Sequence, residues 1–177
     1  VSGMGASLNR QSCPPDEPVL YVDALAIGAG TGHSWADAYT DLQSAMQNNC
    51  AFVEEIRVAA GTYKPTSGAD RAATFTMRSG LAIYGGFAGN ETTREERDPW
   101  LNTTILSGEI NNTFSWPDNS HHVVTAIGVD STAILDGFTV TAGYGDVGGG
   151  GGGILAYNNG DPTLSNLNLY QNYGDEG

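Results

Sequence analysis

Short apolar runs that each end in a glycine or an asparagine recur along this chain, and their spacing limits the folds open to it. The runs occupy residues 56–61, 81–85, 104–108, 134–137 and 163–166. Their last residues follow one another at intervals of 23 to 29 residues, the period of a solenoid with one circuit per repeat. Glycine and asparagine adopt a positive φ more readily than other residues, as a coil requires at a sharp corner. The expected column of corner residues is Gly61, Gly85, Gly108, Gly137 and Asn166.

The remaining segments agree with an all-β parallel β-helix that has an α-helical cap. Residues 19–22 are expected to form a strand, and shorter strands are expected at 75–77, 122–125 and 153–156. Ser34, with Asp37 three residues later, resembles a capping box and predicts an amphipathic α-helix that ends near Asn48. The expected organisation is an irregular lead-in over 1–18, a strand and helix cap over 19–55, and rungs over 56–177 that continue beyond the chain end.

The charge of the chain excludes some partners. It has 20 acidic and 7 basic residues, a net charge of −13, and no lysine or arginine after Arg97. Nucleic-acid binding needs clustered basic residues, so we expect no nucleic-acid partner. No apolar run reaches the 18 residues of a membrane helix, so we expect no direct membrane insertion. The acidic residues indicate a solvated surface or, alternatively, a weak calcium site, for which the candidates are Asp130, Asp146 and Asp161.

The two cysteines and three sequons point to an extracytoplasmic protein. Cys13 and Cys50 have no metal-binding spacing, so we expect a disulfide between them, with two free buried thiols as the alternative. The asparagines of the N-x-[ST] sequons are candidates for glycosylation. They are Asn90, Asn102 and Asn111.

Several segments resemble a known group of proteins. They are residues 21–24 (YVDA), 34–43 (SWADAYTDLQ), 58–65 (VAAGTYKP), 84–92 (YGGFAGNET), 105–108 (ILSG) and 135–140 (LDGFTV). Together they resemble the opening part of secreted bacterial surface proteins built of right-handed parallel β-helix repeats, akin to polymorphic outer-membrane protein repeats. The resemblance implies a right-handed parallel β-helix and a secreted or cell-surface location in a bacterium. It implies no catalytic motif.

The chain offers no catalytic set and no cofactor other than calcium, so an enzyme is the less favoured class. Stacking is expected to bring Asp136 near Ser165 or Ser107 rather than near a second acid, as glycoside hydrolysis would require. Four tyrosines in the late repeats could stack on sugar rings or, alternatively, on one another along the coil. They are Tyr144, Tyr157, Tyr170 and Tyr173.

The expected function is that of a non-catalytic extracellular module, which serves as a structural stalk, an adhesin or a filament subunit. Its expected partners are extracellular glycans or other copies of the chain, which would add to an uncapped C-terminal rung, since residues 171–177 contain no capping sequence. The alternative is a polysaccharide-binding β-helix, or a polysaccharide-cleaving one of the lyase or hydrolase type.

Overall fold

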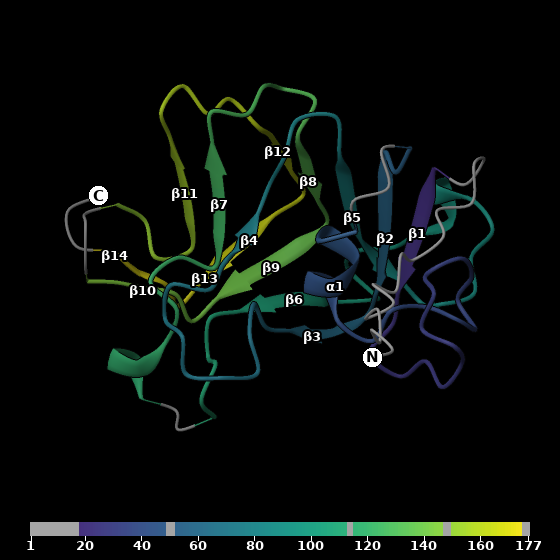
Figure 1. Cartoon of the computed structure of the whole chain (residues 1–177), viewed down its shortest axis with the longest axis horizontal. Helices are drawn as coiled ribbons and strands as arrows, with labels where there is room; N and C mark the ends of the chain where they lie inside the picture. Colours follow the sequence, from purple (N-terminus) through teal and green to yellow (C-terminus); the bar gives the residue numbers. More distant parts are fainter. Residues whose placement is uncertain (1–17, 49–51, 113–114, 147–149, 175–177) are drawn as a thin grey trace, which may run out of the picture.

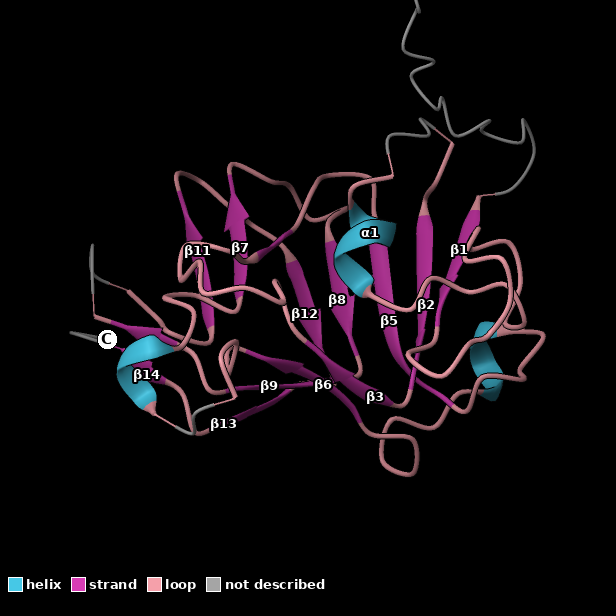
Figure 2. Cartoon of the chain, turned by 60° about the horizontal axis from the view of Figure 1, so that its bottom comes forward, coloured by secondary structure: helices cyan, strands magenta, loops and turns pink. Residues whose placement is uncertain are grey.

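Almost all the regular structure of the chain is parallel β-strand (Figures 1 and 2). A computed structural model describes residues 18–48, 52–112, 115–146 and 150–174. Within these residues the fold is all-β, with one short α-helix, α1 (Leu42–Met46), and two single-turn 3₁₀ helices, η1 (Arg94–Glu96) and η2 (Trp116–Asp118). In this part of the chain the longest apolar helix is far too short to cross a membrane.

The strands form three main parallel sheets and one small one. In order of pairing, the first sheet contains β1 (Val19–Val22), β2 (Glu55–Ala59), β5 (Ala82–Phe87), β8 (Ile134–Asp136) and β12 (Thr163–Ser165). The second contains β13 (Asn168–Tyr170), β9 (Phe138–Thr141), β6 (Thr104–Ser107) and β3 (Gly61–Tyr63). The third contains β11 (Ile154–Tyr157), β7 (Val124–Ile127) and β4 (Phe75–Thr76), and the small sheet pairs β10 (Tyr144–Gly145) with β14 (Tyr173–Gly174).

The chain passes through the three main sheets in a recurring order. From β2 it enters β3 and β4 and then returns to the first sheet at β5, which pairs with β2. The next passage runs through β5, β6 and β7, and the one after it through β8, β9 and β11. Figure 2 shows β2, β5 and β8 side by side, with β3, β6 and β9 running across below them. Each strand therefore pairs with strands of the neighbouring passages rather than with its neighbour in sequence.

The core lies on the inward face of these sheets. Leu20, Ile56, Ile83 and Leu135 are successive partners across the first sheet, and each is at most 2% exposed. Full burial of one such side chain stabilises a fold by about 1.5–3 kcal/mol. The next partner, Leu164 on β12, is 41% exposed. The apolar core is thus continuous from β1 to β8 and open at β12 among the described residues.

The predicted α-helix begins later than the sequence indicated. Helix α1 starts at Leu42, with the Asp41 side chain accepting the Ser44 N–H at 2.7 Å as its N-cap. Residues 34–41 are not helical. The Asp37 N–H donates to Ser34 Oγ at 3.1 Å in a local turn. Tyr39 then pairs in parallel with Val22 of β1, and this pairing holds the segment extended where the capping pattern predicted a helix.

The expected single column of corner residues is wrong in part. Gly85, Gly137 and Asn166 follow paired residues of β5, β8 and β12, so they occupy equivalent positions in the first sheet. Gly61 lies in the second sheet, where it pairs with Thr104 at the start of β6. Gly108 lies at the other end of the second sheet, where its N–H donates to the Thr141 carbonyl at 2.9 Å. The reason is that residues 104–107 form a strand of the second sheet, so the 23- and 29-residue steps on either side of Gly108 together make one long passage.

Candidate functional site

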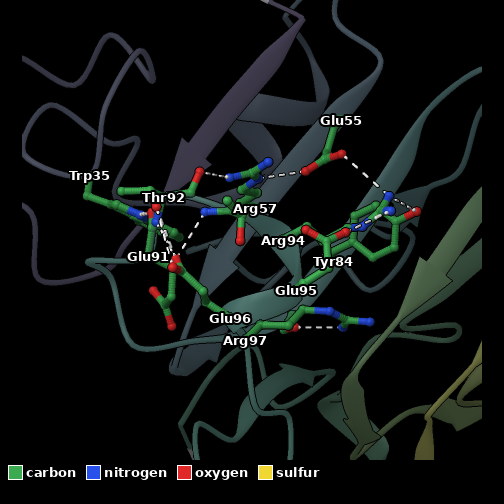
Figure 3. A network of polar contacts seen from close by, with 12 residues as sticks. Trp35, Glu55, Arg57, Tyr84, Glu91, Thr92, Arg94, Glu95, Glu96 and Arg97 are labelled. Carbon is green, nitrogen blue, oxygen red and sulfur yellow. Dashed lines mark hydrogen bonds and ion pairs between the residues drawn. The ribbon is translucent and has the colours of Figure 1, made fainter.

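Residues 88–103, called here the covering segment, contact the outer face of the first sheet (Figure 3). The outward side chains of Arg57, Tyr84 and Asp136 lie in register on β2, β5 and β8. The Trp35 indole N–H donates to the Glu91 carbonyl at 2.8 Å, and Arg57 Nη1 donates to the Thr92 carbonyl at 3.1 Å. Side chains from the sheet and from the preceding turn therefore hold this long segment in place.

Carboxylates within the covering segment bind its own backbone. The Glu91 carboxylate accepts the N–H groups of residues 88, 89 and 90 at 2.6 to 3.0 Å. The Glu96 carboxylate accepts the N–H groups of Thr93 and Thr92, and these bonds lower the pKa of Glu96. Both acids are thus used to order the segment, because a carboxylate that accepts backbone N–H bonds is held in its ionised form.

A salt bridge joins the covering segment to β8. Arg97 Nη2 lies 2.8 Å from Asp136 Oδ1, and the two side chains are 14% and 13% exposed. Ser165 Oγ and Asn166 Nδ2 also donate to the Asp136 carboxylate, at 2.8 and 2.9 Å. Burial by itself raises the pKa of Asp136, but the hydrogen bonds from Asn166, Arg97 and Ser165 and the charge of Arg97 lower it overall. Asp136 therefore lies beside Ser165, as expected, whereas Ser107 lies in the second sheet.

A tight turn in the covering segment presents an aromatic side chain. The Asp98 carboxylate accepts the Trp100 and Leu101 N–H groups at 3.0 and 3.1 Å, and the Asp98 N–H donates to the Gly86 carbonyl at 2.8 Å. The Trp100 side chain is 86% exposed. A large exposed aromatic side chain on an ordered turn is a common element of binding surfaces.

Two adjoining hollows lie beside this turn. A cavity of about 140 Å³ is lined by Pro99, Trp100, Thr103, Thr104, Gly137, Phe138, Thr139, Asn166, Leu167 and Asn168. A more open hollow of about 350 Å³ is lined by Arg94, Glu95, Arg97, Pro99, Trp100 and Asn166. Because they share three lining residues, we treat them as one groove, called here the Trp100 groove. It is the candidate functional site.

The tyrosines proposed as carbohydrate contacts do not form a single cluster. Tyr144 and Tyr173 pair on β10 and β14, and their rings stack with centroids 4.8 Å apart and planes at 25°. Tyr157 on β11 and Tyr170 on β13 belong to different sheets and are 54% and 55% exposed. Only one pair therefore matches the alternative of aromatic stacking along the coil.

The acidic calcium candidates lie at separate places. Asp130 accepts the Thr132 N–H and hydroxyl, and Asp161 is in the neighbouring turn, where its N–H donates to the Val129 carbonyl at 2.8 Å. Asp146 instead forms an ion pair with Arg71 at 2.7 Å, which lowers the pKa of Asp146. Among the described residues no group of three metal-binding side chains was found.

The modification candidates differ in setting. Asn90 is exposed, Asn111 is half-buried, and the half-buried Asn102 donates through Nδ2 to the Gly86 carbonyl at 3.3 Å. Cys13 and Cys50 lie outside the described residues, so their disulfide stays a prediction.

Sequence reasoning missed the groove. Arg97 appeared only as the last basic residue, and Trp100 was not singled out at all. The available signal was Asp98-Pro99-Trp100, in which a large aromatic residue follows two turn-forming residues instead of lying in an apolar run.

Comparisons with protein-family models, with curated proteins and with solved structures each found no match. The family resemblance seen in the sequence therefore stays a prediction, and the function must be argued from the residues described above.

Proposed function

We propose that the chain is a right-handed parallel β-helix module of a secreted or surface protein, with a non-catalytic role as a structural stalk, adhesin or filament subunit. The observation that carries this proposal is the recurring passage of the chain through three parallel sheets. A chain that winds as a coil visits each wall once per circuit and pairs there with the previous circuit. Parallel crossovers within one sheet are almost always right-handed, which favours that hand for the coil.

The N-terminal strand and helix are proposed to cap this coil. Strand β1 is the outermost strand of the first sheet and pairs with β2 alone. Leu42 and Ala45 of α1 are each 1% exposed and belong to the same core as the first sheet. Covering an open rung in this way removes unpaired backbone and apolar surface from water.

The ionised state of the acids supports a non-catalytic role. A general acid in glycoside hydrolysis needs a raised pKa. In the described residues the carboxyl groups with a shifted pKa are all shifted downward, and each accepts hydrogen bonds that favour its charged form. These groups are Glu96, Asp130, Asp136 and Asp146.

Two measurements test the proposal. Nuclear Overhauser effects between methyl groups should connect Ile56 with Ile83 and Ile83 with Leu135, but not Ile56 with Leu135. A direct effect between the outer pair would contradict the stacked coil. Incubation with neutral and acidic polysaccharides should release no reducing ends and no unsaturated sugars. Release of either would favour the polysaccharide-cleaving alternative and contradict a non-catalytic role.

A filament role makes a separate demand on β12 and β13. Leu169 on β13 is 60% exposed and Leu164 on β12 is 41% exposed, so this edge offers apolar surface to a second copy. We expect the sedimentation coefficient to rise with protein concentration, and Leu169→Lys to abolish that rise. The control is Leu101→Lys, which adds the same charge at a 78% exposed position in the covering segment. An equal effect of both variants would contradict association through this edge.

A further inference from the structure

Trp100 is exposed on a turn that the fold holds firmly. Pro99 packs against two glycines: a Cβ at Gly86 would lie 2.6 Å from Pro99 Cα, and a Cβ at Gly137 would lie 3.2 Å from Pro99 Cγ. The Asn102 N–H donates to the Asp98 carbonyl at 2.8 Å and closes the turn. The indole is thus placed before any ligand arrives, which reduces the entropy lost on binding.

The floor of the Trp100 groove offers neutral polar groups beside apolar ones. Thr103, Thr139, Asn166 and Asn168 supply hydroxyl and amide groups. Phe138 and Leu167 supply apolar surface in the same cavity. Side-chain amides and hydroxyls both donate and accept hydrogen bonds, which matches a ligand that carries several hydroxyl groups. An aromatic ring presents a flat apolar face to the C–H groups of such a ligand.

The charges at the groove are already balanced. Arg97 is paired with Asp136 at 2.8 Å. Arg94 donates to the Tyr84 hydroxyl at 3.2 Å and lies 3.3 Å from Glu95 and 3.8 Å from Glu55. Two guanidinium groups therefore face at least three carboxylates. An anionic ligand would have to compete with these carboxylates, so the electrostatics favour an uncharged one.

From these observations we infer that the Trp100 groove binds a neutral saccharide, with one sugar ring stacked on the Trp100 indole and its hydroxyl groups bonded to the threonine and asparagine side chains of the floor. This site is separate from the tyrosines considered above as sugar contacts, and it does not depend on the stalk, adhesin or filament role.

Nuclear magnetic resonance of the indole N–H groups tests the inference directly, because the chain has three tryptophans. The Trp35 indole N–H is bonded to the Glu91 carbonyl and serves as an internal reference, and the 43% exposed Trp116 serves as a second one. The probes are neutral gluco-, manno-, xylo- and galacto-oligosaccharides, each titrated to millimolar concentration. Oligogalacturonate and oligoglucuronate form the charged arm.

We expect at least one neutral oligosaccharide to shift the Trp100 signal in a saturable manner while the two reference signals stay in place. Trp100→Ala should weaken that binding by about tenfold, which corresponds to about 1.4 kcal/mol. Trp100→Phe should retain most of the affinity. Trp116→Ala, the matched control, should leave it unchanged.

Three outcomes would overturn the inference: binding by uronate oligomers alone, no shift with any neutral probe, or equal affinity in wild type and Trp100→Ala. The stalk and filament tests read out methyl contacts and sedimentation, so a failure here is distinguishable from a failure there.

Discussion

Removing the Arg97 guanidinium tests how strongly the covering segment is anchored to the first sheet. Arg97→Met keeps much of the side-chain length but removes the 2.8 Å salt bridge to Asp136 and the 3.0 Å hydrogen bond to the Gly85 carbonyl. Removing one partner of a buried ion pair costs about 3–5 kcal/mol. Ser165 and Asn166 still donate to the Asp136 carboxylate, so we expect the low end, about 3 kcal/mol lost from the free energy of unfolding.

The pH dependence of that loss has a definite sign. The pKa of Asp136 is lowered in the folded protein, so its stabilising effect is present above the ordinary carboxyl pKa of about 3.9. It is lost as the pH falls through the lower folded value, because the protonated group no longer attracts Arg97. The difference between wild type and Arg97→Met should therefore be largest near about pH 7 and shrink toward about pH 3.

The assay is urea unfolding followed by far-ultraviolet circular dichroism, for Arg97→Met, Asp136→Asn and the double variant. We expect an interaction energy of about 2 kcal/mol between the two positions. The control is Arg71→Met, whose pair with Asp146 is more exposed, at 24% and 31%, and should cost only about 1 kcal/mol. An interaction energy below about 0.5 kcal/mol, or a loss that does not change with pH, would refute the reasoning.

Three further predictions follow from backbone strain, core burial and metal binding. Gly137→Ala should lower the free energy of unfolding by about 3 kcal/mol, because φ is +86° and a Cβ would lie 2.6 Å from Arg97 Nη1; Gly80→Ala, with φ of +76° and nothing within 4 Å, should cost about 1 kcal/mol, and equal losses would contradict the contact. Leu135→Ala should cost about 2–5 kcal/mol, whereas its partner in register, the 41% exposed Leu164→Ala, should cost less than about 1 kcal/mol by the same unfolding assay. Added calcium should leave the melting temperature unchanged, because Asp146 is already paired with Arg71; a rise that chelator reverses would support the calcium-stabilised alternative.

The strands of the first sheet could be predicted because their signals are local. Residues 134–137 and 163–166 combine an apolar run with a residue suited to a corner, and they appear as β8 and β12 with their corners in register. Residues 104–108 carry the same signal, yet they belong to the second sheet. A strand followed by a corner looks alike in either sheet. Only the lengths of the segments between corners tell the two apart, and long loops such as the covering segment hide those lengths.

The start of the helix could not be predicted from its capping residues. Ser34 and Asp37 have the residue types of a cap, and they do form the expected local hydrogen bond, but in a turn. The extended path of Tyr39 depends on pairing with Val22, a contact made by tertiary structure. The Trp100 groove escaped prediction for a similar reason. Its floor comes from β8, β9 and the turn after β12, which only the fold brings beside residues 98–103.

The glycines of β5 connect the fold to the proposed saccharide site, and one substitution can test that connection. Gly86→Ala would place a Cβ 2.6 Å from Pro99 Cα, whereas Gly89→Ala has the same φ of +93° but a nearest contact of 3.2 Å, to an Asp23 carboxylate oxygen. Backbone strain is therefore matched, and the two variants differ in whether they push the Trp100 turn off the sheet. We expect Gly86→Ala to move the Trp100 indole N–H signal and to weaken neutral-saccharide binding by about tenfold, or about 1.4 kcal/mol. Gly89→Ala should keep both. Equal behaviour of the two variants would show that the turn does not depend on the close approach of Pro99 to the β5 backbone.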